Sequence, residues 1–217
     1  MLKGKTALVT GSTSGIGLGI ALSLAQQGAR LVLNGFGDSQ PAIDAVKALG
    51  VDVRYHGADM TKPDEIADMM AFAASEFGRV DVLVNNAASN IRRKALDVTP
   101  EEWNMHIGVN LTGTFFMSQQ MGRHLIAAKR PGAIISISST HAVIGAVERS
   151  TYGVGKAGIV HMARMLAIEW AEFGIRVNTV APGRLDTESP SRASTSSDPK
   201  YNGLDPEDVT VTNADDP

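Results

Sequence analysis

A tyrosine and a lysine lie four residues apart in a segment with the apolar period of a helix. Tyr152 and Lys156 therefore share one face of the helix that we predict over residues 151–173. A nearby ammonium stabilises a phenolate and lowers the pKa of a tyrosine. Such a phenol is suited to exchanging a proton with an alcohol or a carbonyl. Upstream, Ser138 and Ser139 end a short apolar strand, where a hydroxyl can point into the cleft outside the strand's carboxyl end.

Glycines and small hydroxylic residues follow the first predicted strand. Residues 10–17 read Thr-Gly-Ser-Thr-Ser-Gly-Ile-Gly and lead directly into a predicted helix. Glycines in such a turn let backbone N–H groups and the helix N-terminus approach a pyrophosphate. The spacing Gly-x3-Gly-x-Gly differs from the common dinucleotide fingerprint, and no Lys-Ser/Thr pair follows it as a P-loop requires. The turn therefore predicts dinucleotide binding, with a purely structural glycine turn as the alternative.

Short β-rich apolar runs alternate with helical segments over the first 180 residues. We predict strands over 6–10, 31–34, 51–55, 80–85, 133–137 and 175–180, and helices over 15–28, 40–49, 63–77, 100–128 and 151–173. Several strands are apolar on both faces, as strands covered by helices on both sides must be. Glycines at 28, 50, 78 and 174 fall where helices should end. This alternation predicts a doubly wound α/β fold, in which a parallel six-stranded sheet lies between two layers of helices.

Composition narrows the classes of function. The chain has 217 residues, 43% of them hydrophobic, which is enough to bury the core of a domain. A net charge of −3 argues against a general nucleic-acid or acidic-membrane binder. The absence of cysteine excludes disulfides, thiolate nucleophiles and cysteine-ligated zinc, and it fits the cytoplasm, where we place the protein. We expect no signal peptide, no membrane span and no metal site.

The acidic charge is concentrated at the end of the chain. Residues 188–217 carry seven acidic side chains against one arginine and one lysine, a net charge of −5, so the first 187 residues carry +2. The same segment has little apolar surface to bury, so disorder is expected there. We therefore predict a dinucleotide-binding catalytic domain over 1–187, followed by a flexible acidic tail or partial substrate loop over 188–217.

In combination, these motifs resemble the short-chain dehydrogenase/reductase family over about residues 3–187. The glycine turn matches the family's cofactor turn, and residues 85–88 are similar to its Asn-Asn-Ala-Gly segment, with alanine in place of the final glycine. The resemblance implies four catalytic residues, namely Asn110, Ser139, Tyr152 and Lys156. It also implies cofactor contacts from Gly11, Ser12, Thr13, Ser14, Gly15, Ile16, Gly17, Phe36, Asp59, Met60, Asn86, Ala87, Tyr152, Lys156, Pro182, Gly183 and Thr187.

The resemblance implies a reaction as well as a fold. A hydride would move between nicotinamide C4 and the carbinol carbon of the substrate. Tyr152 would exchange the hydroxyl proton, and Lys156 would assist it and hold the nicotinamide ribose. Ser139 would hydrogen-bond the substrate oxygen, and Asn110 would support a water relay. The alternative is a truncated or diverged member that binds nucleotide or scaffolds a complex without turnover, because the family's seventh strand is not found in this sequence.

The end of the second strand bears on the choice of cofactor. In the family, a carboxylate there binds the adenosine ribose of NAD, whereas an arginine favours the phosphate of NADP. Gly35 and Phe36 occupy these places, and Ser14 stands where many NADP-binding relatives have a basic residue. With no cation near the expected phosphate, NAD is favoured over NADP.

The candidate substrate residues are Asn90, His141, Arg149 and Arg184. His141 and Arg149 stand where 3-hydroxybutyrate dehydrogenases of the family place a histidine and a lysine on the substrate carboxylate, a task that arginine performs bidentately. Asn90 and Arg184 depart from the glutamine and tryptophan of those enzymes, and residues 90–94 and 182–187 instead resemble sugar and polyol dehydrogenases. We therefore expect a small hydroxy acid, sugar or polyol, with reduction of a 3-oxoacyl thioester as the alternative. The family's paired long helices imply a homodimer or a homotetramer.

Overall fold

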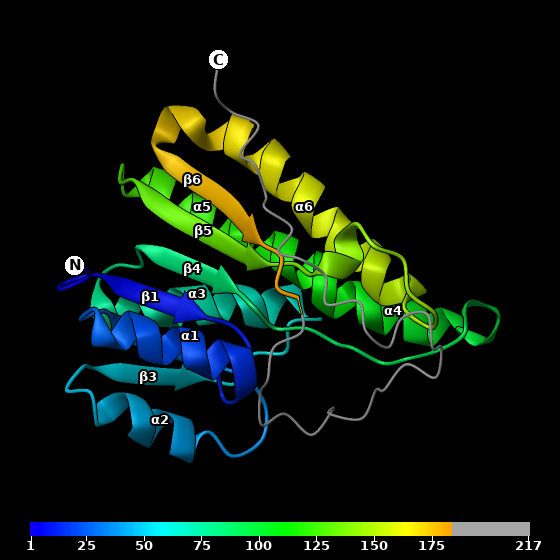
Figure 1. Ribbon diagram of the computed structural model, residues 1–217. Coiled ribbons are helices and arrows are strands. Elements are labelled where there is room, and N and C mark those ends of the chain that lie inside the picture. The colour runs from blue at the N-terminus through cyan, green and yellow to red at the C-terminus, as the bar shows by residue number, and fades with distance from the viewer. Residues whose placement is uncertain (184–217) are drawn as a thin grey trace.

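Six parallel strands form a single sheet in the computed structural model, which describes residues 1–183 (Figure 1). The strands are β1 (Thr6–Val9), β2 (Arg30–Asn34), β3 (Val53–His56), β4 (Val82–Asn85), β5 (Gly132–Ile137) and β6 (Ile175–Val180). Their order in the sheet is β3-β2-β1-β4-β5-β6. The order reverses between β1 and β4, and ligands of doubly wound folds bind outside the carboxyl ends of the strands at such a point. The predicted fold class is confirmed.

Helices cover both faces of the sheet (Figure 1). They are α1 (Gly15–Gln26), α2 (Gln40–Lys47), α3 (Pro63–Phe77), α4 (Pro100–Ile107), α5 (Thr114–Ala127) and α6 (Ser150–Trp170). Helices α1 and α2 pack on one face, and α3, α5 and α6 pack on the other. The side chains of strand β1 alternate between the two faces. Ala7 and Val9 pack with α1 and α2, and Leu8 packs with α3, α5 and α6, and all three are fully buried. None of the helices within residues 1–183 is long and apolar enough to cross a membrane.

The predicted helix over 100–128 is wrong in one respect. A π-helix, η2 (Gly108–Gly113), separates α4 from α5. A side chain at Gly113 would bring a Cβ within 2.2 Å of the Met60 carbonyl oxygen, so the backbone closely approaches the segment between β3 and α3. A π-turn keeps the apolar residues near helical spacing, so periodicity alone does not reveal it. Short 3₁₀ turns, η1 (Ala95–Asp97), η3 (Thr140–Ala142) and η4 (Ala171–Phe173), complete the secondary structure.

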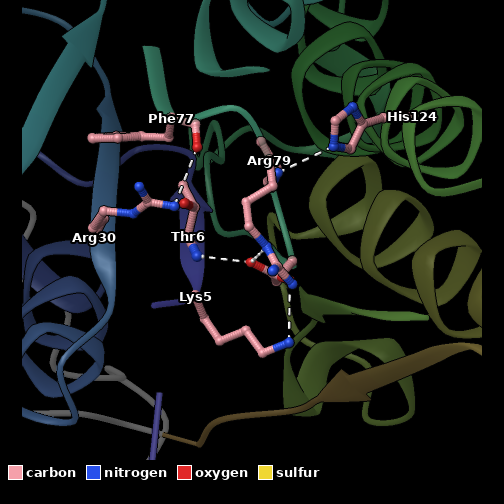
Figure 2. Close-up of polar contacts among 8 residues, drawn as sticks. Lys5, Thr6, Arg30, Phe77, Arg79 and His124 are labelled. Carbon is pink, nitrogen blue, oxygen red and sulfur yellow. Dashed lines mark hydrogen bonds and ion pairs between the residues drawn. The ribbon is translucent and has the colours of Figure 1, made fainter. Parts of the chain in front are cut away.

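A buried carboxylate joins β1 to β4 at the amino end of the sheet (Figure 2). Asp81 is 5% exposed and accepts hydrogen bonds from the Thr6 N–H at 2.9 Å and from Nε of Arg79 at 2.7 Å. The ammonium of Lys5 lies 3.3 Å from the same carboxylate. Burial opposes its charge, but the hydrogen bonds from Arg79 and Thr6 outweigh burial and hold the pKa of Asp81 below its usual value.

Two further contacts close this end of the molecule (Figure 2). Nε2 of His124, on α5, accepts the Val80 N–H at 3.1 Å. The guanidinium of Arg30 donates to the Phe77 carbonyl at 3.2 Å and lies 4.9 Å from the centre of the Phe77 ring. The amino end is thus fixed by contacts that run from the strands to the last turns of α3 and α5.

The predicted boundary at residue 187 and the predicted tail over 188–217 lie outside the described residues.

Candidate active site

A cavity of about 480 Å³ lies at the carboxyl ends of β1, β2 and β4. Most of the predicted cofactor contacts line it, namely Gly11, Thr13, Ser14, Gly15, Ile16, Gly17, Phe36, Asp59, Met60, Asn86, Ala87 and Tyr152. Ser12 points into the protein instead, because its N–H donates to the Asn34 carbonyl at 2.6 Å and its hydroxyl donates to the Val9 carbonyl at 2.7 Å. Residues distant in the sequence therefore meet around one space at the topological switch point.

The glycine turn is packed tightly on one side and open on the other. A Cβ on Gly17 would lie 2.1 Å from the Gly11 carbonyl oxygen, and a Cβ on Gly11 would lie 2.8 Å from the Cα of Ala87. Gly15 has a left-handed φ of 55° and no atom within 4 Å of an added Cβ. The side chain of Asn86 holds the turn by donating to the Gly11 carbonyl at 2.9 Å. This open cradle at the N-terminus of α1 fits a pyrophosphate.

Asn34, at the end of β2, is a residue that the sequence reasoning missed. It is 1% exposed, and its amide donates to the carbonyls of His56 and Ala58 at 3.0 and 2.9 Å. Its Oδ1 accepts the Gly11 N–H at 3.3 Å. Asn34 thus ties the glycine turn to the ends of β2 and β3. A polar residue ending an apolar strand is the signal in the sequence that could have found it.

Asp59 and Phe36 line the same cavity as Tyr152. Oδ1 of Asp59 accepts the Thr61 N–H at 2.9 Å, and this hydrogen bond lowers the pKa of the carboxyl. The Phe36 carbonyl accepts from the Thr13 hydroxyl at 3.3 Å, and the Phe36 side chain is 70% exposed. This part of the cavity lining therefore combines the Asp59 carboxylate with the exposed ring of Phe36.

Lys156 is held behind Tyr152 by the end of β5. Its side chain is buried, with 2% exposure, and Nζ donates to the Ile137 carbonyl at 2.6 Å. Nζ lies 5.7 Å from the centre of the Tyr152 ring. Its own carbonyl accepts the Ser138 hydroxyl at 2.9 Å. Burial lowers the pKa of Lys156 to about 8. The i, i+4 pair of the sequence is thus a tyrosine at the cavity backed by a buried amine.

The two serines after β5 have different surroundings. The Ser138 hydroxyl donates to the Lys156 carbonyl on α6. Ser139 precedes η3, and its Oγ accepts the His141 N–H at 3.2 Å. Pro182 lies beside the same turn, because its carbonyl accepts the Thr140 N–H at 3.2 Å. Gly183 follows it, and Thr187 lies outside the described residues.

Asn110 is fully buried in the π-helix η2. Its Oδ1 accepts the Ser89 N–H at 3.0 Å, and its Nδ2 donates to the Ser89 carbonyl at 2.9 Å. Its Cβ lies 3.1 Å from the position that a Cβ on Gly155 would take, so glycine lets η2 approach α6. The amide of Asn110 therefore clamps the loop that follows β4.

Three of the four candidate substrate residues gather around Tyr152. The His141 and Tyr152 rings lie edge to face with centres 6.0 Å apart. Cζ of Arg149 lies 5.8 Å from the centre of the Tyr152 ring, and Nη1 of Arg149 donates to Asn90 Oδ1. His141 and Arg149 also line a second cavity of about 490 Å³ beside the first. Arg184 lies outside the described residues.

Groups of three or more metal-binding side chains do not occur within residues 1–183. The side chains gathered around the cavity offer a phenol, an amine, a hydroxyl and a guanidinium.

Comparisons with known proteins agree with this arrangement. The family model described as short chain dehydrogenase matches residues 5–198. D-beta-hydroxybutyrate dehydrogenase of Cupriavidus necator is 45% identical over 185 residues, which are 84% of this chain and 71% of that protein. 2-dehydro-3-deoxy-D-gluconate 5-dehydrogenase of Escherichia coli is 38% identical over 188 residues, 87% of this chain and 74% of that protein. A solved short-chain type dehydrogenase/reductase from Mycobacterium marinum is 32% identical with a TM-score of 0.81, covering 84% of this chain and 75% of that one.

Proposed function

Because the chain belongs to the short-chain dehydrogenase family, we propose that it transfers a hydride between NAD and the secondary alcohol or ketone of a small hydroxy acid or sugar acid. The observation that carries the proposal is the position of Tyr152. Its side chain borders the cavity at the carboxyl ends of the strands, with the buried amine of Lys156 5.7 Å from its ring. A proton donor and a nearby cation are therefore positioned beside a space that can hold a dinucleotide.

The cavity fits the cofactor that the family requires. Gly15 and the N-terminus of α1 would hold the pyrophosphate, because a Cβ at Gly15 would enter open space and helix N-termini attract anions. Phe36 and Asp59 would hold the adenosine. When bound, the nicotinamide supplies or accepts the hydride, which no side chain of the protein can do.

Proton transfer falls to the protein's own side chains. Tyr152 would exchange the proton of the substrate hydroxyl, and the cationic form of Lys156 would favour negative charge on the phenol oxygen. Ser139 would donate a hydrogen bond to the substrate oxygen. Asn110 would contribute by holding the loop after β4, since its amide is engaged by the backbone of Ser89.

The end of β2 supports NAD rather than NADP. The residues that line the cavity within the described part of the chain include no lysine and no arginine. A Cβ on Gly35 would lie 2.6 Å from Thr13 Oγ1, so the glycine turn closes directly on this strand end. A phosphate on the adenosine ribose would find no cation to pair with here.

A half-buried guanidinium beside Tyr152 supports an acidic substrate. Burial, and then repulsion from Arg92, lowers the pKa of Arg149. A bound anion would therefore stabilise the charged guanidinium. The curated relatives named above act, by their names, on hydroxybutyrate and on a deoxygluconate, which are both carboxylates. A carboxylate on Arg149 would leave the substrate hydroxyl near Tyr152.

Apolar side chains exposed on the two long helices support self-association. Phe115 on α5 is 38% exposed, and Val154, Met165 and Ile168 on α6 are 49%, 54% and 78% exposed. Contiguous exposed apolar patches on soluble proteins commonly mark interaction surfaces. We therefore propose a homodimer or homotetramer formed through α5 and α6, which light scattering after gel filtration would detect.

NADH absorbance measured with a substrate panel tests the proposed function. The panel contains 3-hydroxybutyrate, a sugar acid, neutral sugars, polyols and a 3-oxoacyl thioester, each with NAD and with NADP as appropriate. We expect turnover of a hydroxy acid or sugar acid with NAD, with the Cupriavidus necator relative as the positive control. Tight NADH binding with no turnover of any compound would overturn the proposal and indicate a nucleotide-binding protein instead.

A further inference from the structure

Asn90 and Arg149 join the loop after β4 to the start of α6. The two residues are 59 positions apart in the sequence, and Nη1 of Arg149 donates to Asn90 Oδ1. The same guanidinium lies over Tyr152, 5.8 Å from the ring centre. The amide of Asn90 is thus satisfied by an arginine and sets the direction of that arginine relative to the reacting phenol.

The backbone on both sides of this contact is fixed. Asn110 clamps Ser89, the residue before Asn90, through two hydrogen bonds. Glu148, the residue before Arg149, has a left-handed φ of 62°, which residues other than glycine rarely adopt. Strained backbone of this kind concentrates at sites that hold a ligand.

The strained residue is itself attached to the loop after β4. Its carbonyl accepts the Arg93 N–H at 3.2 Å, and the Arg93 guanidinium pairs with Glu102 of α4 at 2.5 Å. One backbone hydrogen bond, from Arg93 to Glu148, therefore joins the loop to the start of α6 in addition to the contact between Asn90 and Arg149. The hydrogen bond between Asn90 and Arg149 therefore fixes the orientation of the guanidinium.

Arg149 forms no ion pair within the described residues. Over residues 1–183, no carboxylate lies within ion-pair distance of its guanidinium. A neutral amide oxygen occupies one N–H and leaves the charge and the other donors for a ligand. An aspartate at the same place would satisfy the guanidinium from within the protein. Asparagine therefore orients the arginine without neutralising it.

We propose that Asn90 is a positioning residue that acts through Arg149, orienting the guanidinium toward a substrate carboxylate, and that it does not itself bind the substrate. The proposal rests on the proposed function, because it assigns the anionic end of the substrate to Arg149. It makes the preference for acidic substrates depend on a contact between two protein side chains.

Charged and neutral substrates separate this role from a general structural one. We expect Asn90→Asp to raise KM for 3-hydroxybutyrate about a hundredfold, because the new carboxylate competes for Arg149. Asn90→Ala should raise it about tenfold by freeing the guanidinium. KM for a neutral secondary alcohol should change less than about twofold in both variants. Asn90→Gln keeps the amide oxygen and should recover part of the loss.

A double-mutant cycle supplies the decisive comparison. In an Arg149→Gln background, Asn90→Ala should leave KM for the hydroxy acid unchanged, because the residue through which it acts is gone. A further loss in that background, or an equal loss for charged and neutral substrates, would overturn the proposal. Far-ultraviolet circular dichroism and thermal unfolding verify that each variant is folded.

Binding of propionate in the presence of NADH provides a readout that needs no turnover. Calorimetric titration should show weaker propionate binding in Asn90→Asp than in the parent protein by about a hundredfold. If the parent protein turned over nothing, the proposed function would fail, and the titration would still test the contact between Asn90 and Arg149. Unchanged propionate affinity in Asn90→Asp would overturn the inference alone.

Discussion

The two ends of the same sheet treat charged side chains in opposite ways. At the amino end, Asp81 is paired with Arg79 and its hydrogen-bonding capacity is used within the protein (Figure 2). At the carboxyl end, Lys156 and Arg149 lie near Tyr152, and within residues 1–183 no carboxylate pairs with either of them.

The pKa shifts record the same difference. The pKa of Asp81 is lowered because its partners outweigh burial, so folding stabilises the charged form. The pKa of Lys156 is lowered to about 8 because burial is not compensated, so folding disfavours the charged form. The amino end therefore contributes stability, whereas the carboxyl end keeps cations available for a ligand. Substitutions at the two ends should accordingly separate stability from activity.

Removing the Tyr152 hydroxyl should give the largest loss of activity. Tyr152→Phe is expected to lower kcat about a thousandfold, because the phenol is the group that exchanges the proton. Hydrogen bonds to this hydroxyl are absent within the described residues, so the urea midpoint and NADH affinity should stay near the parent values. NADH absorbance measures kcat, fluorescence titration measures NADH affinity, and urea denaturation gives the midpoint. Retention of more than about a tenth of kcat would show that another group transfers the proton.

A side chain added to the glycine turn should give the second-largest effect, a loss of NADH affinity. Gly17→Ala would place a Cβ 2.1 Å from the Gly11 carbonyl oxygen and 2.4 Å from Nδ2 of Asn86. Backbone must move to relieve this overlap, so NADH affinity should fall about a hundredfold by fluorescence titration. Gly19→Ala is the matched control on the same helix, where an added Cβ meets nothing within 4 Å. It should keep NADH affinity and raise stability by about 1 kcal/mol.

Removing the amino-end carboxylate should affect stability alone. Asp81→Ala leaves the buried Thr6 N–H and the Arg79 guanidinium without their acceptor, and should lower the free energy of unfolding by about 3 kcal/mol. Urea denaturation measures the loss, and kcat/KM should be unchanged. The control is Glu76→Ala, which removes an exposed ion pair with Arg54 and should cost less than about 1 kcal/mol. Equal losses in the two variants would contradict the assigned role of Asp81.

Sequence signals were sufficient where local chemistry sets the structure. The predicted helix over 63–77 matches α3 (Pro63–Phe77), because proline opens it and Gly78 ends it with a φ of 69°. The strand predicted over 175–180 matches β6 (Ile175–Val180). The π-helix within 100–128 was missed, since it is set by the close approach of Gly113 to Met60, which are far apart in the sequence.

The same distinction applies to the candidate site. The i, i+4 spacing of Tyr152 and Lys156 predicts a shared helix face, and in the structure Nζ of Lys156 lies 5.7 Å from the centre of the Tyr152 ring. Asn34 could not be assigned in this way, because its role comes from backbone groups of two other segments, the glycine turn at Gly11 and residues 56–58 after β3. The contact between Asn90 and Arg149 likewise depends on how the loop after β4 meets α6, which no spacing encodes.

The smallest expected effect is a pH dependence of stability at the amino end. Burial, and then the charge of Arg130, lowers the pKa of His124, whose Nε2 accepts the Val80 N–H. The unfolded chain therefore binds a proton at higher pH than the folded chain does. The stabilisation is complete above about pH 6.5 and is lost as the pH falls toward the lower folded-state pKa.

The His124→Gln variant tests this pH dependence, because its amide oxygen accepts a hydrogen bond and does not titrate. Between neutral pH and pH 5, its free energy of unfolding, measured by urea denaturation, should fall less than that of the parent protein, by up to about 1 kcal/mol. Parallel pH profiles for the two proteins would show that His124 does not sense pH, and kcat/KM should be the same in both, as expected for a residue at the end of the sheet opposite Tyr152.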